Sequence, residues 1–461
     1  MDAGSIPTQA STIKKRPLWT FFCCEILVWR TGTGSHARKG LQVACAILPR
    51  SKPLQAVSQV AFSNGRHWRC EHSDPGLHNK KNRPLWTFFC CEINMQMCII
   101  SIMINTISLT DFRNHSMCRI TTHGHNNIII TGPNGAGKTA ILEAVSMLSG
   151  DRGMRGAQMS DMARFTGNGG FSVFAGLVDE TELSVQYTSG DSNRRAKIDG
   201  DNASLTDLSK HLHIVWLTPK EDRLFIDSAS DRRAFFDRLA TCFDVSHMGR
   251  CAKLSKLLSE RAYALKSGAD AHWLDALDTQ IAGVAVTISA SRIQYCGELN
   301  YFLSDCAVSV SGKIEQMLID GMSAGDAERL YMDYLRENRF LVGDKMVIDG
   351  PHKSDFGVFN KKLNLPAHLT STGQQKTVLI DLILAHTKLV FTKTGRTSII
   401  LLDEAAAHLD NSARLKFFQQ LHDLNAQVWA TGLDQEVFQD VPNALFVTCH
   451  DGQISNIVYG E

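Results

Sequence analysis

The chain has 461 residues, of which 44% are hydrophobic and 21% are charged, and its formal net charge is +1. This composition is ordinary for a soluble globular protein and allows two or three domains. No apolar run reaches the ~18 residues that span a bilayer, which excludes a membrane-spanning helix. The 13 cysteines form no CxxC pair, so we expect free thiols in the reducing cytoplasm and no cysteine metal site.

Residues 1–96 differ in character from the rest of the chain. Residues 1–100 carry 13 Lys and Arg against 5 Asp and Glu, whereas the remainder carries 35 against 42. The segment RPLWTFFCCEI occurs at 16–26 and again, letter for letter, at 83–93. Structural repeats share a pattern rather than a string. We therefore expect residues 1–96 to be unstructured or mistranslated; the alternative is a basic arm that binds nucleic acid.

From about Met97 the sequence predicts a strand, a polar turn, and then a phosphate-binding loop. In NNIIITGPNGAGKTAILEAVSML an apolar strand leads through glycines into a helix, and the loop matches G-x-x-x-x-G-K-[ST]. Lys138 is expected to reach the β- and γ-phosphates of ATP, and the Thr139 hydroxyl to bind Mg²⁺. Arg113 and Arg155 are further candidates for nucleotide contact. The predicted phosphate-binding residues are Gly132, Pro133, Asn134, Gly135, Ala136, Gly137, Lys138 and Thr139.

A second motif, SIILLDEAAAHLD, spans residues 398–410. Four apolar residues predict a buried strand that ends in the acidic pair Asp403 and Glu404. At the end of this strand, Asp403 can hold Mg²⁺, directly or through water, and Glu404 can polarise an attacking water. An acidic pair after a strand is weak evidence alone, but together with the phosphate loop it predicts ATP hydrolysis, with Lys138 and Glu404 as the catalytic residues.

The stretch TSTGQQKT at 370–377 precedes an apolar helical run. Small residues and free backbone N–H groups at a helix N-terminus favour an anion. The stretch also reads x-S-x-G-Q and resembles the signature of the ATP-binding-cassette (ABC) ATPases, with Ser371, Gly373 and Gln374 at matching positions. That resemblance implies contact with the γ-phosphate held by a second chain, in a head-to-tail dimer, and places Asp410 in the loop that crosses the interface. The alternative is an ordinary serine helix cap.

The spacing of these motifs and several phrases resemble the RecF family. The phrases are ISLTDFRNH (107–115), LTPKEDRLFIDSASDRRAFFDRL (217–239), DGPHKSDF (349–356) and STGQQKTVLIDLILA (371–385). The family usually has Arg-Asp-Asp after Gly-Pro-His, whereas Lys353, Ser354 and Asp355 follow here, which puts in doubt any role of a bidentate arginine at that place. The resemblance implies an α/β fold: an ABC-type P-loop ATPase head in two pieces, 97–220 and 345–461, split by a helical lobe at 221–344.

The same resemblance implies a function. We expect a recombination mediator of DNA replication and repair that binds double-stranded and gapped DNA in an ATP-dependent manner, at single-strand gaps and duplex junctions. Its weak ATPase activity would release the DNA and an ATP-dependent homodimer. RecR and RecO are the expected partners, and no membrane contact is expected. Basic residues in the lobe (Lys253, Lys256, Arg261 and Lys266) fit DNA binding or a solvated face about equally well. The alternatives are an ABC ATPase that does not act on DNA, such as a transporter-coupled one, and an inactive scaffold, which the intact motifs disfavour.

Overall fold

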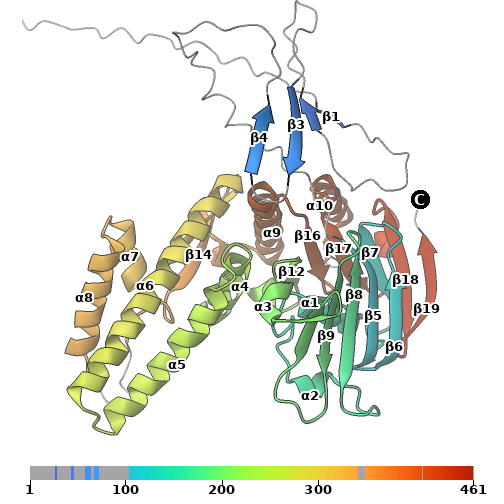
Figure 1. Ribbon diagram of the computed structural model, residues 1–461. Helices are drawn as coiled ribbons and strands as arrows, with labels where there is room; N and C mark the ends of the chain where they lie inside the picture. Colours follow the sequence, from blue (N-terminus) through green and yellow to red (C-terminus); the bar gives the residue numbers. More distant parts are fainter. Residues whose placement is uncertain are drawn as a thin grey trace, which may run out of the picture. The chain divides into compact units, whose positions relative to one another are not determined.

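The computed structural model describes residues 103–340, 348–406 and 409–459, together with four short strands within residues 26–71 (Figure 1). The chain divides into two compact units, Met1–Met95 and Gln96–Glu461. The first unit contains an antiparallel sheet with the order β1-β2-β3-β4. Its strands are β1 (Ile26–Val28), β2 (Val43–Cys45), β3 (Ser58–Ser63) and β4 (His67–Glu71).

These four short strands are the described part of the segment that was expected to be unstructured or mistranslated. For the other residues of 1–96 that expectation lies outside the described residues.

A six-stranded sheet forms the centre of the second unit, in the order β12-β16-β17-β7-β18-β19. All neighbours pair in parallel except β19, which is antiparallel at the edge. Because the strands are parallel, the loops that follow them share one edge of the sheet, where α/β proteins usually bind ligands. The strands are β7 (Asn127–Thr131), β12 (His213–Leu217), β16 (Ser398–Leu402), β17 (Gln427–Gly432), β18 (Ala444–His450) and β19 (Gln453–Tyr459).

Helix α1 (Lys138–Met147) lies between this sheet and a second, antiparallel one. Every residue of α1 except Thr139 is buried, because both sheets pack against it. The antiparallel sheet has the order β11-β10-β9-β8-β5-β6. Its strands are β5 (Ile104–Phe112), β6 (His115–Thr121), β8 (Phe171–Leu177), β9 (Glu182–Tyr187), β10 (Arg195–Ile198) and β11 (Asp201–Ala203).

The other face of the central sheet is covered by α9 (Thr372–Thr394) and α10 (Asn411–Asp423). Along β7, Ile128 and Ile130 face α1, while Ile129 joins the opposite core, as the two-residue period of a strand requires. Burying both faces stabilises the sheet by about 25 cal/mol for each Å² of apolar surface removed from water. The apolar runs that predicted these strands are therefore explained by burial on both sides.

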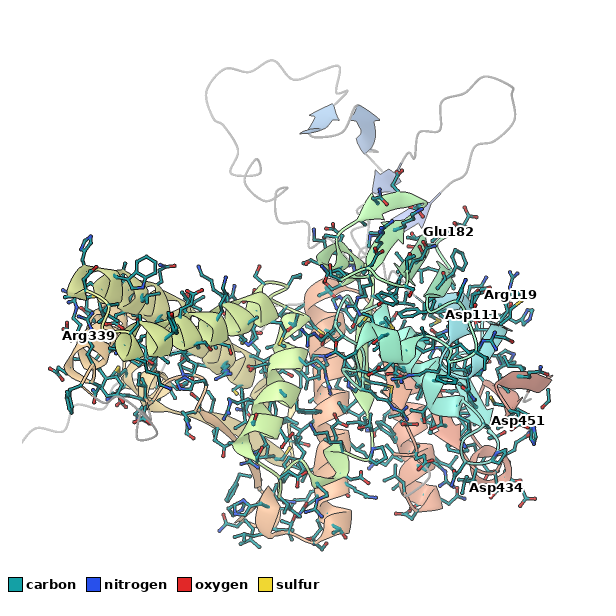
Figure 2. All side chains as sticks on the ribbon, turned by 90° about the horizontal axis from the view of Figure 1, so that it is seen from below. Asp111, Arg119, Glu182, Arg339, Asp434 and Asp451 are labelled. Atoms are coloured by element: carbon teal, nitrogen blue, oxygen red, sulfur yellow. The ribbon has the colours of Figure 1, made fainter. Side chains whose placement is uncertain are left out.

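Between the two pieces of the central sheet the chain forms a helical lobe. Helices α5 (His247–Lys266), α6 (Ala271–Phe302) and α8 (Ala324–Glu337) lie side by side and extend away from the sheets (Figure 1). A buried pair, Arg261 with Asp278, joins α5 to α6 at 2.6 Å. Arg339, at the far end of the lobe in Figure 2, pairs with the same aspartate. Neither alternative, DNA binding or a solvated face, therefore fits the buried Arg261, whereas Lys253, Lys256 and Lys266 are exposed.

The remaining elements are short or link the lobe to the sheet. Helix α4 (Ala229–Thr241) packs on a three-stranded sheet, β13-β14-β15, and both join the core beneath α9. Those strands are β13 (Cys306–Ser311), β14 (Asp355–Asn360) and β15 (Leu365–Pro366). The other elements are α2 (Met159–Met162), α3 (Leu205–Leu208), α7 (Lys313–Ile319), η2 (Glu221–Arg223), η3 (Ala367–Leu369) and η4 (Glu436–Phe438).

The predicted fold class is confirmed: β7 and β12 precede the lobe, β16 to β19 follow it, and all belong to one sheet. The exact domain boundaries at 220/221 and 344/345 stay a prediction, and α4 shares its core with α9 rather than with the outer lobe. Among the described residues, no helix has the length and apolar character needed to cross a membrane.

Candidate nucleotide-binding site

The loop after β7 has the backbone shape that the glycine pattern predicts. Gly132, Gly135 and Gly137 all have positive φ, at 144°, 81° and 109°. A Cβ on Gly132 would lie 2.1 Å from the carbonyl oxygen of Cys449, and one on Gly137 would lie 2.5 Å from His115 Nε2. Neither position therefore accepts a side chain. Helix α1 begins directly after this loop with no side-chain cap, which leaves its first N–H groups available to an anion.

Lys138 is the first residue of α1, and its side chain turns back onto the phosphate loop. Its ammonium group donates to the carbonyl oxygens of Gly132 at 2.7 Å and Pro133 at 3.0 Å, and only 5% of the residue is exposed. The described residues give it no carboxylate partner. Its charge is therefore balanced only by backbone dipoles, and a phosphate in the loop would be a stronger partner than these carbonyl groups.

The acidic pair after β16 meets the start of α1. The Thr139 hydroxyl donates to Asp403 Oδ1 at 2.8 Å, and the Thr431 hydroxyl, at the end of β17, donates to the same oxygen at 3.0 Å. Thr431 also accepts the backbone N–H of Glu404 at 2.9 Å. Asp403 and Thr139 thus bring oxygen atoms to one point, and such oxygens are the ligands that Mg²⁺ prefers. The residues present fit this cation.

Glu404 lines the same pocket as the phosphate loop. The pocket has a volume of about 410 Å³, and its walls include Asn134 to Thr139, Arg113, Arg155, Phe165 and Glu404. Glu404 has φ of 58°, a conformation that non-glycine residues rarely adopt. Such strain is often found at functional sites. The structure therefore brings Lys138, Thr139, Asp403 and Glu404 together, although their assigned roles stay predictions.

Several residues that support the loop escaped the sequence analysis. His115 places one ring nitrogen 2.7 Å from the Gly452 oxygen and the other 3.1 Å from the Gly137 oxygen. Arg113, predicted only as a nucleotide contact, forms a bidentate pair with the buried Glu143 of α1, at 2.8 and 2.6 Å. Thr431 also gave no signal. A pattern search could not find them, because each acts through a contact between distant segments.

The signature stretch forms the first turn of α9. Ser371 is the N-cap: its hydroxyl accepts the Gln374 N–H at 3.4 Å, and Gln374 Oε1 accepts the Ser371 N–H at 2.9 Å. The serine-cap reading is therefore correct as a description of local structure. All residues from Ser371 to Gln374 are exposed, and a Cβ on Gly373 would meet nothing within 4 Å. The helix cap at Ser371 is compatible with an anion-binding site, because the backbone of this turn is still exposed to solvent.

The signature and the phosphate loop of one chain lie apart. Lys376, in the first turn of α9, pairs with Asp222 of η2 at 3.2 Å, just after β12. The phosphate loop follows β7, which is three strands away from β12 in the sheet order. At about 4.8 Å for each strand, the strands β12 and β7 themselves lie roughly 14 Å apart in the sheet. No signature residue lines the pocket of the phosphate loop.

Asp410 caps α10 and does not enter the pocket. Its carboxylate accepts the Ala413 N–H at 3.0 Å and the Ser412 hydroxyl at 2.7 Å. These hydrogen bonds, first of all that from Ala413, hold the pKa of Asp410 below its ordinary value. The preceding residues 407 and 408 lie outside the described residues. The role of Asp410 in a dimer interface stays a prediction.

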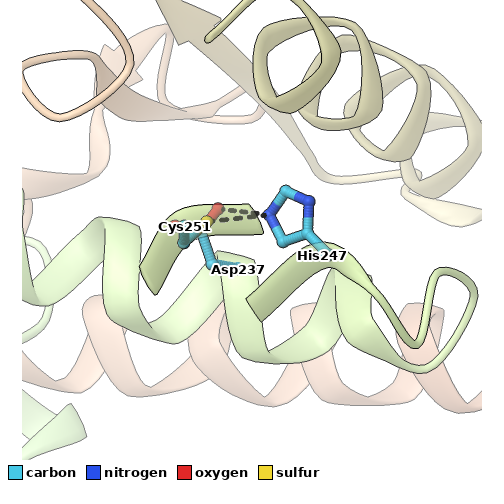
Figure 3. A group of neighbouring side chains, drawn as sticks. All are labelled: Asp237, His247 and Cys251. Carbon is cyan, nitrogen blue, oxygen red and sulfur yellow. Dashed lines mark hydrogen bonds and ion pairs between the residues drawn. The ribbon is translucent and has the colours of Figure 1, made fainter. Parts of the chain in front are cut away.

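A separate group of potential metal ligands lies where α4 meets α5. Figure 3 shows Asp237, His247 and Cys251 side by side. Arg292 already binds both carboxylate oxygens of Asp237, at 2.8 and 2.7 Å. Burial alone would raise the pKa of Asp237, but hydrogen bonds from His247 and Arg292 hold it below its ordinary value. Burial, and then Asp237, raise the pKa of Cys251 to about 12, so its thiol is protonated. Within this group, Asp237 is therefore part of a buried ion pair with Arg292, and this pair joins α4 to α6.

The phrase DGPHKSDF has a structural role that its sequence did not reveal. Asp355 accepts a bidentate pair from Arg232, at 2.7 and 2.9 Å. Arg233 donates to the Ser354 oxygen at 2.7 Å, and Arg292 donates to the Pro351 oxygen at 2.6 Å. The bidentate arginine therefore comes from α4, and the phrase supplies the carboxylate that receives it.

Comparison with known proteins agrees with this architecture. Residues 103–456 match the family described as RecF/RecN/SMC N terminal domain. The DNA replication and repair protein RecF of Rhizobium leguminosarum bv. trifolii is 35% identical over 369 residues, covering 77% of this chain and 98% of the relative. That of Allorhizobium ampelinum is 36% identical over 370 residues, covering 76% and 98%.

A solved structure titled "Structure of the recombination mediator protein RecF-ATPrS in RecFOR pathway" is also similar. It has a TM-score of 0.68 and 21% identity, and the match covers 77% of this chain and 98% of that one. Fold and site together define an ABC-type ATPase head with an inserted helical lobe. The extent and identity of the sequence matches go further: the chain belongs to the RecF family.

Proposed function

We propose that the chain binds ATP and Mg²⁺ at the loop 132–139, hydrolyses ATP slowly as a head-to-tail homodimer, and thereby controls its binding to DNA during replication and repair. The observation that carries this proposal is the contact of Thr139 with Asp403, because it joins the phosphate loop to the acidic strand end. A glycine-rich turn without a nucleotide role would not need that contact.

Each residue of the site then has a defined task. The N–H groups of the loop and the Lys138 ammonium hold the β- and γ-phosphates, so that Lys138 leaves the carbonyl groups it now contacts. Thr139 and Asp403 hold Mg²⁺, which when bound offsets the charge on the phosphate oxygens. Glu404 orients a water and accepts its proton. Thr431 fixes both acidic residues, through the Asp403 carboxylate and the Glu404 N–H.

The second copy would supply the signature. Ser371 and Gly373 are exposed at the N-terminus of the 23-residue helix α9, where backbone N–H groups and the helix dipole favour an anion. Neither residue lines the pocket of its own chain's phosphate loop, which supports contact with a γ-phosphate held by another chain. A head-to-tail pair instead brings each signature to the other chain's loop, and ATP stabilises only the closed pair.

For the DNA substrate and the partners, support comes from family membership. The relatives are named DNA replication and repair proteins, and a structural neighbour is titled a recombination mediator of the RecFOR pathway. We infer binding to duplex DNA at single-strand gaps and junctions, partnership with RecR and RecO, and a cytoplasmic location. The alternative, an ABC ATPase without a DNA substrate, lacks a supporting feature among the described residues.

Retention on DNA tests this proposal. The protein is passed over immobilised gapped duplex with ATP, with ADP and without nucleotide, at rising salt. We expect retention only with ATP, and a log–log salt dependence with a slope of several units, because phosphate contacts release counterions. Lys138→Ala should abolish the ATP effect. Equal retention with ATP and ADP, or none at low salt, would refute the proposed DNA function.

A further inference from the structure

One aromatic side chain at the nucleotide pocket is unused by this mechanism. Phe165 is 100% exposed, although it lines the same pocket as Lys138, Thr139 and Glu404. Single exposed apolar residues are common and usually need no explanation. Phe165 differs because its neighbours along the chain are held firmly against the protein, while its own ring is left in solvent at the rim of a polar site.

Backbone contacts fix the segment that carries Phe165. The Met162 oxygen accepts the Arg113 N–H at 2.7 Å, and the Asp111 oxygen accepts the Arg164 N–H at 2.8 Å. Ala163 forms a bridge with Phe112, the last residue of β5. The segment therefore extends the pairing of β5 up to the residue before Phe165.

Side chains add to this attachment. The Arg164 guanidinium pairs with Asp111 at 2.7 Å, and Arg113 Nη1 donates to the Asp161 oxygen at 2.8 Å. The same Arg113 holds Glu143 of α1. Phe165 is thus connected, through Arg113, to the helix that begins at the phosphate loop. The backbone that carries the Phe165 ring is thus fixed at the pocket before any ligand arrives, which limits the order lost on binding to the side chain itself.

The residues that line the pocket include two chemically different sets. The loop residues Asn134 to Thr139 offer backbone N–H groups and the Lys138 ammonium, which suit phosphates. Ala163, Phe165 and Arg155 offer an apolar surface, a π face and a guanidinium plane. Flat heterocyclic bases stack on such groups. With the phosphates of ATP at the loop, the second set is left for the other end of the same molecule.

We propose that Phe165 is the platform on which the adenine base of ATP stacks. This inference rests on the proposed nucleotide function and adds a residue that determines affinity. Stacking uses the face of the base rather than its hydrogen-bonding edge, so ATP and GTP should bind within a few-fold of one another. Pyrimidine triphosphates, with a smaller ring, should bind more weakly.

The test compares a ligand with a base and a ligand without one. ATP and inorganic tripolyphosphate are each titrated, with Mg²⁺, into the full chain and into Phe165→Ala and Phe165→Trp. All carry Ser371→Arg, which removes any contribution from a second copy. We expect Phe165→Ala to weaken ATP binding about tenfold, to leave tripolyphosphate binding unchanged, and Phe165→Trp to bind ATP at least as tightly as the parent.

Tyr301→Ala is the matched control, since Tyr301 is an aromatic residue on α6 that is 85% exposed and does not line the pocket. It should change neither affinity. Two results would overturn the platform: unchanged ATP affinity in Phe165→Ala, or an equal loss for both ligands, which would indicate a distorted loop. If the parent bound neither ATP nor tripolyphosphate, the proposed nucleotide function itself would fail, which is a separate and recognisable result.

Discussion

The two halves of the proposed ATPase site differ in how complete they are within one chain. At the phosphate loop, Lys138, Thr139, Asp403 and Glu404 are already connected by hydrogen bonds to each other, to Thr431 or to the loop. At the signature, the residues Ser371 to Gln374 are exposed, and the two hydrogen bonds between Ser371 and Gln374 close their own helix turn. The first half is assembled by folding, and the second is presented to solvent.

This difference indicates where regulation can act. Residues that meet across strands of one sheet are held by the core, so the loop half needs no partner to keep its geometry. Among the described residues, those that line the phosphate-loop pocket include none of the signature. If ATP joins the two halves of different chains, hydrolysis depends on association, and a change at each half should have a different consequence.

The largest expected effect is at the loop. Lys138→Ala removes the buried cation of the pocket, and we expect ATP affinity to fall about a hundredfold or more, with loss of hydrolysis. Isothermal titration measures the affinity. Lys256→Ala, an exposed lysine on α5, is the control and should bind ATP like the parent. Similar affinities in both variants would exclude Lys138 from phosphate binding.

Glu404→Gln separates binding from cleavage. The amide keeps the shape of the side chain but cannot accept a proton, so we expect hydrolysis to fall by about a hundredfold while ATP affinity stays within a few-fold. Dimers and DNA complexes formed with ATP should last longer. Hydrolysis at the parental rate, measured as phosphate release, would mean that another group activates the water.

A third comparison separates the cap from the signature. Ser371→Arg and Ser323→Arg both replace an N-cap serine that accepts the N–H three residues on, at 3.4 and 3.1 Å. Each should lower the free energy of unfolding by about 1 kcal/mol. Only Ser371→Arg should also prevent ATP-induced dimerisation, because Ser323 lies on α8 in the lobe. If both variants dimerised normally, Ser371 would be a helix cap alone.

The smallest effect is expected at the N-terminus. A chain beginning at Met97 keeps the whole family match, residues 103–456. We expect it to bind ATP like the full chain and to melt within about 2 °C of it. A drop of several degrees in the melting temperature would show that residues 1–96 stabilise the rest.

The sequence predicted the parts of the site that depend on local pattern. The loop glycines, Lys138 and the acidic pair after β16 were found because strand, turn and helix signals surround them. Contacts between segments left no such signal. His115 beneath Gly137 and Thr431 beside Asp403 come from other strands, so only the sheet order reveals them.

The helical lobe shows the same limit. The family resemblance predicted a helical lobe at 221–344, where α4 and α5 occur. It did not reveal that Arg261 is fully buried against Asp278, because a predicted helix does not distinguish a solvated arginine from a paired one. Burial of that pair depends on how α5 packs on α6, which is a tertiary property.

The most direct test of a site shared between chains is a mixture of two inactive variants. Lys138→Ala and Ser371→Arg are mixed in equal amounts, and ATP hydrolysis and sedimentation are measured. In a head-to-tail pair one shared site collects both changes and the other escapes both. Because neither variant should form an ATP-bound dimer with itself, the dimers that form would be mixed and carry one intact site of two, so we expect activity to reappear, up to about half of the parental activity. No recovery, with each variant remaining inactive at every ratio, would contradict a site built from two chains.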